Sequence, residues 1–301
     1  MWFKNLLLFR LDPKHGLTLD ALEEKLSRDA LQPCGSFQME SRGWVHPHGN
    51  ERYVHALERH WLIAFGVNQR LLPSSIINQE TKERAEAMAD KQGHPVGRKQ
   101  LREIKERVIE ELMPKALTRR RVLRAWIDPV NHWLVIDTAA EKKADELLDT
   151  LRKAAGNITI KRLDTAVSPS SAMTKWLSAS KAPAPFGIDQ DLELRAASEG
   201  RATVRYVNHP LDGREIRDHI SSGKAATRLG ITWKERVSFA LTELLQVKRV
   251  TFLEVLKDET QGQAEDADEQ FDIDFALMTG ELSGLITDLV KALGGEKKRE
   301  D

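Results

Sequence analysis

A run of basic side chains in the middle of the chain is the feature best suited to binding chemistry. Between Arg98 and Arg124 there are ten Lys and Arg residues against four Glu. Arg98, Arg102 and Lys105 are spaced by four and three residues, which places them on one face of a helix. Because guanidinium and ammonium groups on one surface neutralise phosphates, this stripe favours a polyanionic partner. A solvated helix face whose charges pair internally explains the stripe alone equally well.

The triplet Arg119 to Arg121 is the stronger indication of a polyanion, because strands seldom carry three consecutive arginines. Strand alternation places Arg119 and Arg121 on one face, and Arg120 with Arg124 on the other. The cluster has no Asn- and Gln-rich recognition helix, so we expect contacts with phosphates rather than with bases. The predicted DNA-binding residues are Arg98, Lys99, Arg102, Lys105, Arg119, Arg120, Arg121 and Arg124, with Lys115, Lys224 and Arg228 added because they lie near strand or loop ends.

Acidic side chains gather near the C-terminus, with ten between Asp258 and Asp288 and no Lys or Arg among them. A helix dipole favours acids at its first turn, and acids on an outer surface would also confine DNA to the basic one. The stretch from Asp268 to Asp274 lacks the Gly and the terminal Glu of a calcium loop. A DNA-processing enzyme that uses these carboxylates with magnesium is the alternative function. A scaffold whose basic face meets an acidic protein is a third.

Motifs for other chemistry are absent from the sequence. His46, His48, His55 and His60 form the one histidine cluster, but no fourth ligand follows at a spacing typical of zinc, so we expect surface or packed histidines. There is no nucleophile elbow, no P-loop and no dinucleotide-binding glycine motif. We therefore expect no metal, no cofactor and no enzymatic activity.

The composition and charge of the whole sequence limit the classes of protein to which the chain can belong. Lys plus Arg equals Asp plus Glu, 46 each in 301 residues, so net charge gives no argument for nucleic acid and only its distribution can. The single cysteine, Cys34, excludes an internal disulfide and fits a reducing compartment. The apolar start is too short for a signal peptide, and no stretch approaches the ~20 apolar residues of a membrane helix. We expect a cytoplasmic protein.

Hydrophobic periodicity and turn residues predict an α+β fold, because helices and strands do not alternate strictly. Strands are expected at 2–11, 43–45, 61–67, 119–127, 133–138, 204–206, 225–230, 237–241 and 247–255. Helices are expected at 18–30, 75–91, 98–112, 140–155, near Trp176, at 212–220 and at 266–293, where Gly280 could break the last one. Four segments follow: a first α+β segment at 1–72, a helical hairpin at 73–116, a strand hairpin with a helix at 117–185, and a C-terminal α+β segment at 186–301.

The two helices around the turn Gly93–Gly97 have thin apolar stripes, so this hairpin should project from the body. Beyond it, Met113 to Leu117 end in apolar residues that the hairpin cannot cover. Exposed apolar tips usually meet a partner, and an isologous contact with a second copy is the commonest solution.

Six short blocks along the chain carry a family resemblance: Trp2–Leu6, Leu31–Ser36, Gly43–Val45, Leu72–Ser74, Trp126–Asp128 and Phe275–Leu282. In this order and at nearly this length they resemble the recombination-associated RdgC family of proteobacteria. The resemblance implies a horseshoe-like subunit of several α+β subdomains that closes into a ring as a homodimer around DNA. It also implies binding of single- and double-stranded DNA without sequence preference, association with the nucleoid, restraint of the recombinase RecA, and no catalytic activity.

The resemblance also assigns one interface residue. Family members have an aromatic side chain after the segment that matches Met113–Ala116, where it helps to close the ring. This chain has Leu117 there, so aliphatic packing is expected at the dimer interface. Arg205–His209 aligns only loosely with a Lys-Gln pair of the family, and that pair is not carried over.

Overall fold

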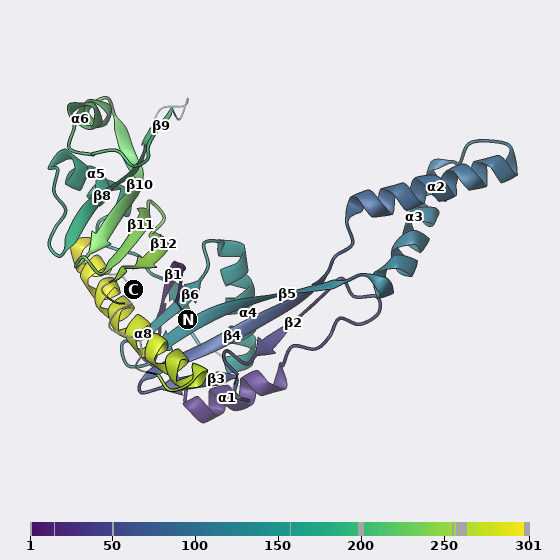
Figure 1. The fold of residues 1–301 in the computed structure, drawn as a ribbon, viewed down its shortest axis with the longest axis horizontal. Helices are drawn as coiled ribbons and strands as arrows, with labels where there is room; N and C mark the ends of the chain where they lie inside the picture. The colour runs from purple at the N-terminus through teal and green to yellow at the C-terminus, as the bar shows by residue number, and fades with distance from the viewer. Residues whose placement is uncertain are drawn as a thin grey trace.

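An extended antiparallel sheet runs through the molecule, shown in Figure 1 as a computed structural model. The structure describes residues 2–14, 16–49, 51–156, 158–197, 202–254, 256 and 264–297. Within these residues the sheet has twelve strands, in the order β2-β4-β5-β6-β1-β12-β11-β10-β8-β9, with β3 paired to β4 and β7 paired to β1. The strands are β1 (Asn5–Leu11), β2 (Glu40–Val45), β3 (Val54–Leu57), β4 (His60–Arg70), β5 (Thr118–Asp128), β6 (Trp133–Asp137), β7 (Ile160–Arg162), β8 (Phe186–Ala196), β9 (Thr203–Tyr206), β10 (Lys224–Trp233), β11 (Val237–Thr242) and β12 (Gln246–Phe252).

Helices cover both faces of this sheet and also form a hairpin that projects from one end of it. They are α1 (Leu19–Arg28), α2 (Ser74–Gln92), α3 (Arg98–Leu112), the 3-10 turn η1 (Met113–Lys115), α4 (Glu141–Ala155), α5 (Pro169–Ser178), α6 (Arg214–Ser221) and α8 (Ala267–Ala292). The expected α+β mixture of helices and strands is confirmed, and the strands form one large antiparallel sheet. The four-segment division stays a prediction.

Two hydrophobic cores lie on opposite faces of the sheet. On one face, α1 and α4 pack over alternate residues of β4, β5 and β1, such as Phe65, Ile127 and Leu7. On the other face, α5, α6 and α8 pack over the alternate set and over β8 to β12. The odd-numbered residues of β4 and β5 therefore face α4, and the even-numbered ones face the side that carries α8.

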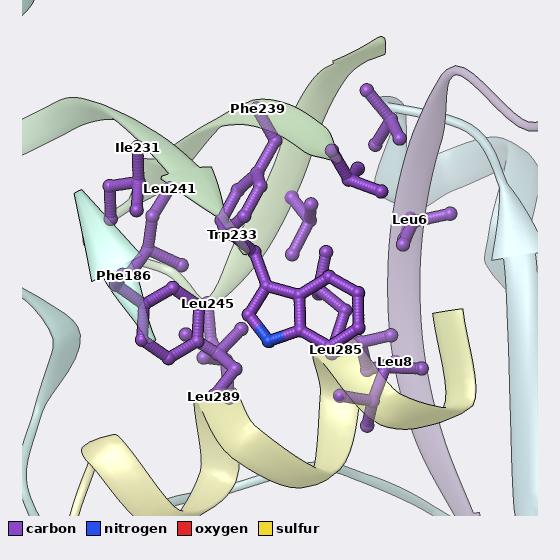
Figure 2. Close-up of a cluster of buried hydrophobic side chains, with 14 of the residues drawn as sticks. Leu6, Leu8, Phe186, Ile231, Trp233, Phe239, Leu241, Leu245, Leu285 and Leu289 are labelled. Atoms are coloured by element: carbon purple, nitrogen blue, oxygen red, sulfur yellow. The ribbon is translucent and has the colours of Figure 1, made fainter. Parts of the chain in front are cut away.

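The core under α8 is built around Trp233, which is 3% exposed. Figure 2 shows its ring between β10, β11 and the C-terminal helix, with Leu285 and Leu289 below it. The indole Nε1 donates a hydrogen bond of 2.9 Å to Asp288 Oδ2, which satisfies the one polar atom of this large side chain. The contact joins the last helix to the sheet.

The hairpin of α2 and α3 projects from one end of the sheet, as its thin apolar stripes predict (Figure 1). Only Ile77 and Thr81 are buried on α2, and only Val108 on α3. Gly93 ends α2 in the left-handed conformation at φ 74°, which glycine adopts without strain. At the other end of the sheet lie β8, β9, β10 and α6, so the outline in Figure 1 is an open curve.

Several details differ from the sequence prediction. The last helix continues through Gly280, because Phe275, Met278 and Leu282 anchor it on both sides, and no backbone approaches this glycine. The strand β8 was missed because acidic side chains interrupt its apolar pattern. The strands β3 and β7 were also missed, because they have only four and three residues.

Two glycines give a matched test of this packing. At Gly43 a Cβ would lie 2.5 Å from the backbone of Leu31, where the chain crosses β2, whereas at Gly280 a Cβ would meet nothing within 4 Å. We expect Gly43→Ala to lower the free energy of unfolding by about 2–3 kcal/mol through steric overlap. Gly280→Ala should raise it by up to about 1 kcal/mol, because alanine is the better helix former. Chemical denaturation measures both, and a neutral Gly43→Ala would contradict the close approach.

Candidate nucleic-acid interface

The pairing of β4 with β5 decides where the arginine triplet points. Arg121 faces α4, since its Nη2 donates a hydrogen bond of 2.9 Å to Glu146 Oε2 on that helix. Arg119 is two residues away on the same strand, so it shares this face. Leu123, next on the same side, packs against the core beneath α4. We call this surface the α4 face.

The two other arginines of β5 lie on the opposite face. Arg120 Nε donates to Asn68 Oδ1 at 3.0 Å. The Nε of Arg124 is buried and has no hydrogen-bond partner among the described residues. Burial raises the pKa of the nearby Asp137 carboxyl, an effect opposed by the backbone N–H groups of Asn5 and Lys4 and by the Arg124 charge. The structure therefore splits the predicted cluster between two surfaces.

A basic residue that the sequence prediction missed joins the α4 face. Arg42 on β2 is paired with Val67 on β4, and Val67 is paired with Arg121 on β5, so the three residues form one row across the sheet. Arg42 Nη2 lies 3.8 Å from Glu146 Oε1, and its Nε lies 2.5 Å from Glu40 Oε1. The hydrogen bond to Glu40 raises the pKa of Arg42. The alternation of charges in Glu40-Ser41-Arg42 was the one signal that could have identified this residue.

Glu146 therefore fixes two arginines from different strands. Its side chain is 16% exposed, whereas those of Arg121 and Arg42 are 35% and 50% exposed. A mostly buried carboxylate that holds two guanidinium groups keeps them in place, and each guanidinium has further N–H donors for another acceptor. Lys143, exposed on the first turn of α4, adds a fourth positive charge to this face.

The basic stripe of the hairpin is placed elsewhere. Arg98, Lys99, Arg102 and Lys105 are exposed or half-buried along α3, which extends away from the sheet (Figure 1). Arg102 Nε pairs with Glu106 Oε1 at 2.9 Å, in the arrangement of a solvated helix. Lys115 is exposed in η1, between the hairpin and β5. The structure does not bring this stripe together with the α4 face.

The two predicted residues at the opposite end of the sheet have internal partners. Lys224 Nζ lies 3.3 Å from His219 Nδ1 and 3.2 Å from Ser222 Oγ. Arg228 is 20% exposed, and its Nη2 lies 3.8 Å from Glu193 Oε2. A phosphate would have to compete with these contacts.

The acidic C-terminal segment contacts the histidine cluster. His48 Nε2 lies 2.7 Å from Asp268 Oδ1, and His55 Nε2 lies 3.0 Å from Asp272 Oδ1. Asp266 caps α8 by accepting hydrogen bonds from two backbone N–H groups of its first turn. The acidic residues Asp258 and Glu259 lie outside the described residues. In the part of the chain that the structure covers, no three His, Cys, Asp or Glu side chains are grouped so that they could hold a metal ion.

Together, these features define the class of the protein: an α+β protein on one large antiparallel sheet, with basic side chains gathered on a sheet face and on a projecting hairpin. The chain belongs to the RdgC family, since the family model described as "Putative exonuclease, RdgC" matches residues 1–296.

Curated relatives extend over nearly the whole chain. A protein of Dechloromonas aromatica is 51% identical over 299 residues, which is 98% of this chain and 98% of that protein. Proteins of Cupriavidus pinatubonensis and Bordetella pertussis are each 49% identical over 298 residues, 99% of this chain and 100% of theirs. All three carry the name "Recombination-associated protein RdgC". The resemblance found in the sequence is thus confirmed. Among the described residues, no helix is long and apolar enough to cross a membrane.

The buried histidines predict a pH dependence of stability. Burial is the main cause that lowers the pKa of His55 below its ordinary value of 6.5, against the raising effect of Asp272, and burial also lowers the pKa of His60. The unfolded chain therefore takes up protons first as the pH falls. The stability from neutral His55 is present above about pH 6.5 and is lost on acidification.

We expect thermal stability to fall between about pH 7.5 and pH 5.5, and to fall less steeply in His55→Gln. Melting temperatures across this range provide the measurement. His94→Gln, at an exposed histidine of the hairpin turn, is the control and should keep the original slope. An unchanged slope in His55→Gln would contradict the assignment.

Proposed function

We propose that this chain binds DNA through the phosphate backbone, without reading sequence, and that the α4 face is its main contact. The proposal rests on the positions of Arg42, Arg119 and Arg121. These residues lie on β2 and β5, the two strands that flank β4, and their side chains share the α4 face. Guanidinium groups held at fixed positions on a sheet match the spaced phosphates of a backbone. The recombination-associated name of the relatives supports a role on DNA.

We propose further that two copies close a ring around duplex DNA. The open curve in Figure 1 leaves a concave side between the hairpin end and the β9 end of the sheet. Near the hairpin, Leu117 is 77% exposed and Leu71 is 47% exposed, and the Leu71 N–H donates to the Leu117 carbonyl at 2.7 Å. Met113, expected from the sequence to be uncovered, is 8% exposed because it packs where α3 meets β5. The proposed contact therefore rests on Leu117 and Leu71.

Occupation of DNA by such a ring would place the chain on the nucleoid and limit the access of RecA, without direct contact between the two proteins. This part of the proposal follows from the family resemblance and from backbone binding, which competes for any sequence alike. Single-stranded DNA would bind to the same arginines, because its phosphates carry the same charge.

A magnesium-dependent nuclease is the second candidate, favoured by the description of the matching family model as a putative exonuclease. Its carboxylates would come from the first turns of α8. There, Asp268 and Asp272 contact histidines, and Asp266 caps the helix. These groups belong to the α8 side of the sheet, away from Arg121. We therefore favour binding without cleavage.

The face assignment predicts different effects for neighbouring arginines. The double variant Arg119→Ala/Arg121→Ala should weaken binding to all sequences alike. It should also reduce the slope of log affinity against log salt by about two, because two fewer phosphates would be neutralised. Arg120→Ala, on the opposite face of the same strand, is the matched control and should retain the original slope. Fluorescence anisotropy over a salt series measures both.

An equal loss in the control would contradict the α4 face as the contact. Incubation of labelled DNA with magnesium belongs in the same experiment, because shortened strands would establish the nuclease. No binding at any salt, together with retention of an acidic protein, would favour the scaffold.

The ring predicts a topological effect. DNA threaded through a closed ring should stay bound on a circle at salt that removes the protein from a short linear fragment. A charge placed in the apolar contact, Leu117→Asp, should open one interface, leave the subunit folded and abolish the difference between circle and fragment. Val130→Asp, at a residue 59% exposed in the turn after β5, is the control.

Sedimentation and salt-wash retention on the two DNAs are the measurements. Equal salt resistance on both DNAs for the unmodified protein, or a stable monomer at micromolar concentration, would refute the ring.

A further inference from the structure

A hollow of about 150 Å³ lies beside Arg121, between the first turns of α4 and the strands β4 and β5. Its apolar lining includes Phe65, Val67 and Leu123, of which the first two are buried in the core beneath α4. Its polar lining comes from Arg121, Asp137, Thr138, Lys143 and Glu146. Val122 also borders the hollow. The hollow thus has an apolar wall and a polar rim, and it belongs to the face proposed to meet DNA.

Arg121 and Lys143 place hydrogen-bond donors at this rim. The Nε of Arg121 is buried without a hydrogen-bond partner, although the Nη2 of the same side chain binds Glu146. Lys143 is exposed beside it, at the first turn of α4. The Nε is closed off from the hollow, but the other N–H groups of the half-buried guanidinium and the ammonium of Lys143 are open to acceptor atoms of a ligand.

The spacing along β5 matches one nucleotide. Residues rise by about 3.3 Å along a strand, so Leu123 lies roughly 6.6 Å from Arg121 on the same face. In a nucleotide the phosphate and the base are separated by one sugar. A phosphate held between Arg42 and Arg121 would therefore place its base over Leu123, at the mouth of the hollow.

We propose that this hollow takes a single pyrimidine base of single-stranded or locally opened DNA, with its carbonyl oxygens accepting hydrogen bonds from the outer N–H groups of Arg121 and from Lys143 Nζ. The proposal rests on the proposed function, because it assumes that the α4 face meets DNA. Proteins that accept an unstacked base hold it between apolar side chains and bind its edge through hydrogen bonds.

A neutral planar ligand fits the charges better than a free anion does. The carboxylates of Glu146 and Asp137 both line the hollow, and they would repel a phosphate or carboxylate placed inside it. The apolar wall of Phe65, Val67 and Leu123 gives no stabilisation to a charged group but packs well against a base. The other occupant to be tested is an apolar side chain of a second copy of this chain.

The test compares two strands of equal charge, an oligothymidylate and an abasic strand of the same length, with the full-length protein at one salt concentration. Leu123→Trp fills the hollow, and Val130→Trp, at an exposed residue in the turn after β5 and outside the hollow, is its control. We expect Leu123→Trp to weaken binding of the oligothymidylate about tenfold and to leave the abasic strand within about twofold. Val130→Trp should change neither.

A second pair of variants keeps the test independent of the folding of Leu123→Trp. Lys143→Met removes the donor but keeps most of the side chain, and it should reduce the ratio of thymidylate to abasic affinity by about threefold. Lys142→Met, also exposed on the first turn of α4, removes the same charge and should leave this ratio unchanged. Thermal melting verifies the folding of all four proteins.

An unchanged affinity ratio in both Leu123→Trp and Lys143→Met would overturn the proposal. So would equal loss of both strands in Leu123→Trp accompanied by dissociation of a dimer, since the occupant would then be a second copy. Failure of the proposed function looks different: the unmodified protein would bind neither strand, or Arg119→Ala/Arg121→Ala would have no effect.

Discussion

The antiparallel pairing of β4 with β5, continuous from Trp61↔Ile127 to Arg70↔Thr118, decides the direction of every side chain on which the account depends. At one end of β5, Ala125, Trp126 and Ile127 are fully buried, so the register there is fixed by two cores. A slip by one residue would move Ala125 and Ile127 into the opposite core and reverse the whole strand. The buried half of β5 thus places Arg119 and Arg121 on the face of the sheet that carries α4, and Arg120 on the opposite face.

Carboxylates beside the arginines hold the guanidinium groups in place on a chain whose formal net charge is zero. Glu146 holds Arg121 and Arg42, and Glu193 lies near Arg228 at the other end of the sheet. These pairs fix the guanidinium groups and also compete with phosphates for them, which favours binding that is salt-sensitive and readily reversed. Among the described residues, the acidic side chains of α8 lie on the opposite side of the sheet, where they would repel a polyanion.

Turn residues and the spacing of apolar residues predicted the positions of most helices and strands. Tertiary contacts determined which side chains lie together and whether a helix continues. The helices of the hairpin were placed within one residue, because Gly93 and Gly97 mark their ends in the sequence. Arg42 was missed because only the pairing of β2 with β4 brings it beside Arg121. Gly280 suggested a break that the packing of Met278 and Leu282 prevents. The sequence identified the basic residues of β5, but only the structure shows that two of them are held by Asn68 and by burial on the far face.

Photo-crosslinking to duplex DNA tests the central claim most directly, because it reports which side of the sheet meets the ligand. A photoreactive amino acid is placed at Lys143 on α4 or at Lys291 on α8, both exposed positions on opposite faces. The account predicts efficient crosslinks from position 143, abolished at high salt, and background yield from position 291. Crosslinks that form mainly from position 291 would contradict it.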